Sequence, residues 1–182
     1  MNRRTMIGGM MAAAAAAPAV LRADELSDWA AWWERSKRYT LQIAEAMPAG
    51  DYNFAPFGNG TPDAVRSGDG ARTFAQVMQH IGQGEGFYLG RLGKGGPAPA
   101  APQNDTSKAA TVKYLNEHFD WAIGVVKQLT QADLAKSFAG GRGPAASGLD
   151  LLLNAMVHTA HTRGYSDMYL RNKGVKPPTY QV

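Results

Sequence analysis

The sequence predicts an all-α protein, a four-helix bundle, and three observations support that fold class. Apolar residues recur at spacings of three and four along four long stretches of the chain, which is the period of an amphipathic helix. Stretches rich in glycine and proline separate them. No stretch shows the alternation of apolar and polar residues typical of a half-buried strand. Four amphipathic helices joined by loops bury their apolar faces against one another, as in a bundle.

The first helix is expected over residues 24–47, where apolar residues from Leu26 to Met47 largely follow the helical period. Pro48, Ala49 and Gly50 end that pattern, and glycine-rich residues 50–70 form a long connection. A second helix is expected over residues 73–92. It contains three glycines, each of which costs up to about 1 kcal/mol relative to alanine; close packing, a ligand near the backbone or simple tolerance would explain them. They are Gly82, Gly84 and Gly86.

The second half of the chain predicts two more helices. Residues 93–105 form a linker rich in glycine and proline, and a third helix follows capping residues at 105–107. A short tail at residues 131–138 precedes a glycine-rich loop at residues 140–143. The last helix begins near Ser147 and ends before Gly174, where a helix-ending glycine is expected.

Composition and charge restrict the function classes. The chain has 182 residues, 45% of them hydrophobic, and no cysteine, so disulfides and thiolate zinc sites are excluded and His, Asp and Glu are the remaining metal ligands. The formal charge is +4, but three of the 19 basic residues lie in residues 1–23, which leaves 16 basic against 15 acidic side chains. A nucleic-acid-binding domain needs a basic surplus on its folded part, so nucleic acid is not an expected partner.

Residues 1–23 predict a signal peptide of the twin-arginine type. Arg3 and Arg4 precede a weakly apolar run of Gly, Ala and Met, and cleavage is expected after Ala19 or Ala23. The run from Thr5 to Leu21 is 17 residues long and mostly Ala and Gly, which is short for a spanning helix. The expectation is export of a folded protein to the periplasm, with residues 24–182 forming the bundle domain and no membrane contact after signal removal.

Three histidines predict a metal site. His80 lies on the second predicted helix, and His158 and His161 lie three residues apart on the last one. Residues three apart on a helix are close enough to converge on one ion. A set of three histidines with an open position for water or substrate suits zinc, nickel or iron. A single histidine on an apolar face is more often a core residue, so the His-x-x-His pair carries the prediction.

Other polar residues are weighed against structural roles. His118 has apolar neighbours on its helix and is predicted to be packed or half-exposed, outside the site. Glu85 follows His80 by five residues, which places it on the wrong face to share an ion with it. Arg163 either anchors an anionic group or makes structural contacts. The tryptophans are read as core and groove-lining residues.

Four segments resemble the DinB/YfiT-like superfamily, whose members are regarded as metalloenzymes. The segments are TLQIAEAMPAGDYNF, TFAQVMQHI, YLNEHFDWAI and LLLNAMVHTAHTRGYSDMYLRNKGVKPPTY, and they span nearly all of residues 24–181. The resemblance implies a four-helix bundle, often dimeric, in which three histidines from the second and fourth helices hold a divalent metal. Some members are thiol-dependent transferases or isomerases.

The chain departs from the family pattern at the metal site. The family places its two ligands on the last helix four residues apart, which would be His158 and position 162, and position 162 is Thr162. The glutamine that usually follows the Arg-Gly pair is Tyr165. Either His161 takes the place of the missing ligand, or a two-histidine remnant is left.

The leading functional prediction is a divalent-metal-dependent enzyme of transferase or hydrolase type that acts on a small-molecule substrate. The ligands would be His80, His158 and His161. A homodimer is expected, because the long helices and the Trp-rich first segment offer apolar surface. The alternative is a metal-free helical bundle that binds a small ligand or a protein partner in a groove.

Overall fold

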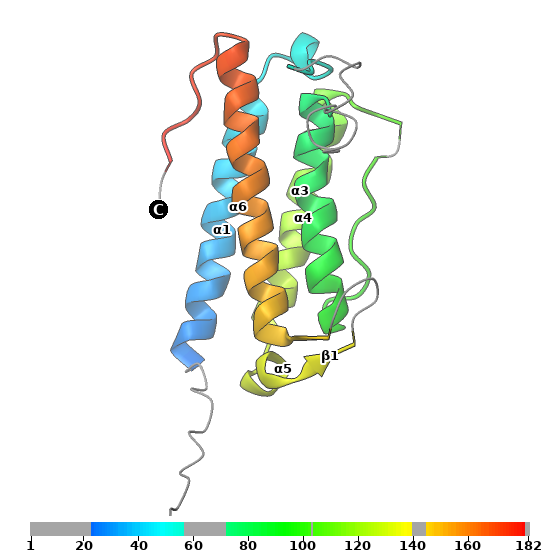
Figure 1. Cartoon of the computed structure of the whole chain (residues 1–182), viewed down its shortest axis with the longest axis vertical. Helices are drawn as coiled ribbons and strands as arrows, with labels where there is room; N and C mark the ends of the chain where they lie inside the picture. The colour runs from blue at the N-terminus through cyan, green and yellow to red at the C-terminus, as the bar shows by residue number, and fades with distance from the viewer. Residues whose placement is uncertain (1–22, 57–71, 103, 140–144, 181–182) are drawn as a thin grey trace, which may run out of the picture.

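The computed structural model describes residues 23–56, 72–102, 104–139 and 145–180. Its four long helices are α1 (Ala23–Ala46), α3 (Phe74–Leu89), α4 (Lys108–Lys127) and α6 (Gly148–Asn172). They run side by side as a bundle in which α3 packs against α6 and α4, and α1 packs against α4 (Figure 1). The predicted all-α bundle is confirmed. The predicted signal segment lies outside the described residues, except for Ala23, the first residue of α1.

Local sequence sets where the helices begin and end. Thr73 begins α3 with a capping box, because its side chain accepts from the backbone N–H of Gln76 while the Gln76 side chain accepts from that of Thr73. Ser147 and Asp150 make the same box at the start of α6. At the other end of α6, Gly174 takes a left-handed φ of 71°, as expected of a glycine that ends a helix.

Short elements complete the chain. A 3-10 turn, η1 (Ala49–Asp51), follows α1. A second 3-10 turn, η2 (Gly90–Leu92), follows α3, so the α-helix ends three residues before the predicted helix end at residue 92. A short helix, α5 (Gln131–Ala135), leads into β1 (Ser137–Phe138), which pairs antiparallel with β2 (Ala146–Ser147). The sequence predicted no strand, and a strand of two residues is too short to show alternation. The predicted loop at residues 140–143 lies outside the described residues.

The core contains tryptophan and other large side chains from all four long helices. Trp33 is fully buried, and Trp29 and Trp32 are partly buried against the core. The three tryptophans of the first segment therefore pack against the core, although Trp29 and Trp32 keep part of their surface exposed. The homodimer stays a prediction. Among the described helices, none is long and apolar enough to cross a membrane.

Candidate metal centre

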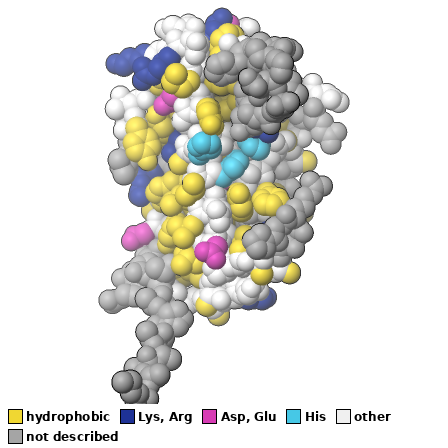
Figure 2. Space-filling model, viewed as in Figure 1, with side chains coloured by type: hydrophobic (Ala, Val, Ile, Leu, Met, Phe, Trp, Pro, Cys, Tyr) yellow, Lys and Arg dark blue, Asp and Glu magenta, His cyan; other side chains and the backbone are white. Residues whose placement is uncertain are grey.

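Two of the three predicted ligands meet between α3 and α6. The Nε2 atoms of His80 and His158 lie 3.3 Å apart, and the two rings meet edge to face with centroids 4.8 Å apart. Both side chains are half-buried. Figure 2 shows histidine side chains gathered on one face of the bundle, beside hydrophobic side chains. The pair is therefore accessible from solvent.

Gly84 makes room for the His158 ring. A Cβ atom at Gly84 would overlap Cε1 and Nδ1 of His158, so any larger residue there would displace the ring. Gly84 lies one turn after His80 on α3, which brings the backbone of α3 directly against α6 at this level. Of the three explanations left open for the glycines of this helix, close packing applies to Gly84, which contacts the His158 ring.

Both imidazoles are held neutral. Burial, followed by the electrostatic effect of nearby His80, His161 and Arg72, lowers the pKa of His158 to about 4. Burial and Arg72 also lower the pKa of His80, against a hydrogen bond with Gln83 that raises it. Neutral imidazole is the form that binds a metal ion. At neutral pH the pair is thus in its ligating form.

The spacing of the pair fits a shared ion. Two imidazole nitrogens at about 2.0–2.1 Å from a tetrahedral ion lie about 3.3–3.4 Å apart, and the two Nε2 atoms are separated by 3.3 Å. The outer nitrogen of a ligating histidine usually donates to a neighbouring acceptor, whereas the buried Nδ1 of His158 has no hydrogen-bond partner among the described residues. The pair thus offers two imidazole nitrogens to an ion, but the outer nitrogen of His158 lacks the acceptor that usually orients a ligating ring.

His161 is not brought to the pair. Its side chain is exposed, and its ring lies edge to face with Tyr165 at 4.8 Å. The inward position one turn after His158 belongs to Thr162, which is 5% exposed. The described residues contain no group of three His, Cys, Asp or Glu side chains that could hold an ion. The three-histidine set therefore stays a prediction that requires His161 to move.

Sequence reasoning missed a second, buried polar cluster in the core. Glu85 places one carboxylate oxygen 3.3 Å from Nδ1 of His118 and accepts from the Thr159 hydroxyl at 2.9 Å with the other. The side chains of His118 and Glu85 are 1% and 0% exposed. A sequence signal existed, because Glu85 falls at helical spacing on the apolar face that Met78, Ile81 and Leu89 form.

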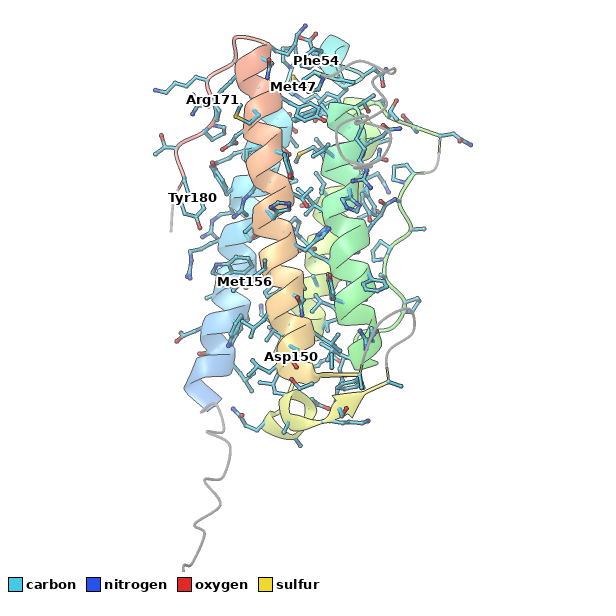
Figure 3. The ribbon with its side chains drawn as sticks, in the orientation of Figure 1. Met47, Phe54, Asp150, Met156, Arg171 and Tyr180 are labelled. Atoms are coloured by element: carbon cyan, nitrogen blue, oxygen red, sulfur yellow. The ribbon has the colours of Figure 1, made fainter. Side chains whose placement is uncertain are left out.

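Arg163 has a structural role. It is 5% exposed, and its Nη1 donates to the Ser36 hydroxyl at 2.8 Å. Its guanidinium lies over the rings of Tyr39 and Tyr180 at 5.0 and 5.7 Å, which stabilises both rings in place. These contacts hold the C-terminal tail, with Tyr180, beside α1 and α6 (Figure 3). Of the two roles considered for Arg163, the structure supports the structural contact.

Comparison with known proteins identifies the family. The family model described as the DinB superfamily matches residues 33–166. The chain belongs to the DinB superfamily. Two solved DinB-like proteins share its fold, and each comparison covers 85% of this chain and 97% of the other: one from Bacillus subtilis (TM-score 0.64, 20% identity) and one from Bacillus cereus ATCC 10987 (TM-score 0.69, 15% identity). No curated protein matches.

All residues of the candidate centre lie within the range that matches the DinB superfamily model. His80, Gly84 and His158 lie inside residues 33–166, as does Thr162 at the position where the resemblance places the third ligand. The tail that Arg163 holds lies beyond the match. The matched range therefore covers most of the bundle and includes both residues of the histidine pair.

Proposed function

We propose that this DinB superfamily protein is a metal-dependent enzyme in which His80 and His158 bind one divalent ion, zinc, nickel or iron. One observation carries the proposal: two half-buried, neutral imidazoles place their Nε2 atoms 3.3 Å apart, the separation suited to a shared ion. Among the described residues, neither nitrogen is paired with a carboxylate. Two protein nitrogens leave coordination positions for water and substrate.

The protein contributes position and charge to such a site. Gly84 lets the His158 ring rest against α3, and burial keeps both imidazoles unprotonated. The Tyr88 ring, 6.2 Å from that of His158, adds an aromatic wall. A bound divalent ion supplies Lewis-acid activation of a water or thiol. The reaction class we propose is a transfer or hydrolysis on a small-molecule substrate.

A metal-free binding module is the second candidate, and a groove favours it. Between α1 and the start of α4 an open groove of about 940 Å³ exposes mostly apolar surface. It lies away from α3 and α6, so its occupant would not contact the histidine pair. Its lining includes Leu41, Ala109 and Val112 with Lys108 and Lys113 at the edge.

Zinc titration of the purified, metal-stripped protein separates the two candidates. We expect one zinc per chain by calorimetry and elemental analysis, and loss of uptake in His80→Ala and in His158→Ala. Wild-type protein that takes up no zinc, nickel or iron at neutral pH would overturn the metalloenzyme proposal and leave the binding module.

Two further variants define the third ligand. His161→Ala is the matched control, since His161 lies on the same helix but is exposed. Zinc retention in His161→Ala indicates a two-histidine centre, and zinc loss indicates that His161 moves to complete it. Thr162→His should raise zinc affinity, because it restores the four-residue spacing from His158.

A further inference from the structure

Glu85 joins three helices at one point in the core. One oxygen of its carboxylate accepts from the Thr159 hydroxyl of α6 at 2.9 Å, and the other lies 3.3 Å from Nδ1 of His118 on α4. All three side chains are at most 1% exposed. Polar contacts inside a core are stronger than the same contacts in water, so α3, α4 and α6 are held together here by bonds of defined geometry.

The histidine pair lies directly beside this junction. Thr159 follows His158 on α6, and Glu85 follows Gly84, the glycine against which the His158 ring rests. The bond between Thr159 and Glu85 therefore ties α6 to α3 one residue away from the contact that brings His158 to His80. Because neighbouring residues belong to the same hydrogen-bonded turn of helix, a shift of α6 at Thr159 also moves His158.

The ring of His158 has no anchor of its own. Its buried Nδ1 lacks a hydrogen-bond partner among the described residues, whereas His80 has a hydrogen bond with Gln83. A ligating histidine is usually oriented through its outer nitrogen. With that contact missing, the position of the His158 ring depends on where α6 holds its backbone and on the space at Gly84.

The carboxylate of Glu85 suits a role in fixing geometry rather than in adding stability. Apolar side chains of similar volume often stabilise a core as well as a buried charged network does. A fully paired buried network instead fixes one arrangement of the elements that it joins. Both oxygens of Glu85 have a contact, so this network meets that condition.

We propose that Thr159 and Glu85 are positioning residues for the histidine pair. Their hydrogen bond fixes α6 on α3, so that Nε2 of His158 stays 3.3 Å from Nε2 of His80. Binding sites need their groups held to within about 0.5 Å, and a larger slip of α6 takes the two nitrogens out of the spacing that suits one ion. The consequence for zinc binding rests on the proposed metal function, whereas the consequence for the two rings does not.

Ring contacts in the metal-free protein test the positioning role. The two ring centroids are 4.8 Å apart, so wild type with a chelator present should give nuclear Overhauser contacts between the ring protons of His80 and His158. Thr159→Val keeps the shape of the side chain without its hydroxyl and should reduce the intensity of these contacts, as should Thr159→Ala. Thr159→Ser keeps the hydroxyl and should restore them.

Thr111→Val controls for the loss of a buried hydroxyl. Thr111 of α4 is 0% exposed, and its hydroxyl accepts from the Gln79 side chain of α3 at 3.0 Å. The change removes a buried bond of the same kind, but between α3 and a helix that carries neither histidine of the pair. Thr111→Val should therefore keep the ring contacts, and every variant should keep its helical circular dichroism.

Zinc calorimetry measures the consequence for metal binding. We expect Thr159→Val to bind zinc about 10–100-fold more weakly than wild type, the usual effect of losing a supporting contact outside the ligands. Thr159→Ser and Thr111→Val should bind zinc as wild type does. Unchanged ring contacts or unchanged zinc affinity in Thr159→Val, or an equal loss in Thr111→Val, would overturn the inference. Wild type that takes up no metal would overturn the proposed function, and the ring contacts alone would then decide the positioning role.

Discussion

Two histidine environments in the same bundle differ in one partner. His118 of α4 faces the carboxylate of Glu85 and is 1% exposed, and His158 of α6 faces the imidazole of His80 and is half-buried. Both rings contact α3, and both helices are long and amphipathic. Helix type therefore does not separate a structural histidine from a candidate ligand. The structural histidine differs from the candidate ligand in its deeper burial and in the presence of an acid.

The two clusters satisfy their polar atoms differently. Glu85 accepts from Thr159 with one oxygen and lies by His118 with the other, so that cluster closes on itself. The pair of His80 and His158 has no acid, and the buried Nδ1 of His158 lacks a partner. Buried polar groups are normally hydrogen-bonded. Of these two clusters, the pair of His80 and His158 is therefore the one that leaves a buried polar atom unpaired.

Removing the acid should produce the largest effect on stability. Glu85→Ala leaves the His118 ring and the Thr159 hydroxyl buried without their partner, and each unsatisfied buried polar group costs about 1–3 kcal/mol in the free energy of unfolding. Urea denaturation measures it. Glu117→Ala removes an exposed carboxylate paired with Lys113 on α4 and should cost no more than about 0.5 kcal/mol. A loss below about 1 kcal/mol in Glu85→Ala would contradict the closed cluster.

A side chain at position 84 should disrupt the pair of His80 and His158. Gly84→Ala puts a methyl group into the His158 ring, so we expect loss of zinc uptake and a cost of about 1–3 kcal/mol from overpacking. Gly124→Ala is the matched control, because a Cβ at Gly124 in α4 meets nothing within 4 Å. It should stabilise the protein by up to about 1 kcal/mol. Full zinc uptake by Gly84→Ala would show that the ring position is not needed.

Acidification should lower the stability of the folded protein through His158. The folded-state pKa of His158 is lowered to about 4 from an ordinary value of 6.5. The unfolded chain takes up this proton near pH 6.5 and the folded chain only near pH 4, so stability falls as the pH drops through that window and is unaffected above it. With a chelator present, the stability difference between wild type and His158→Asn should shift against wild type from pH 6.5 to 4. An unchanged difference would contradict a neutral, buried His158.

The elements of the fold could be predicted because their signals are local. The helical period marks α1, α3, α4 and α6 along the chain, and Thr73, Ser147 and Gly174 mark helix ends through bonds to residues within one turn. The strand pair β1 and β2 could not be predicted, because pairing over two residues depends on how the chain returns to start α6.

The sequence by itself determined the helical bundle, the absence of cysteine side chains and the candidacy of His80 and His158. Only the tertiary structure decided that Glu85 meets His118 and that Arg163 holds the tail. It also turned Thr162 inward and His161 outward. Adjacent residues of a helix point about 100° apart, so the face that packing buries, rather than the spacing alone, selects which of two neighbours can reach a site.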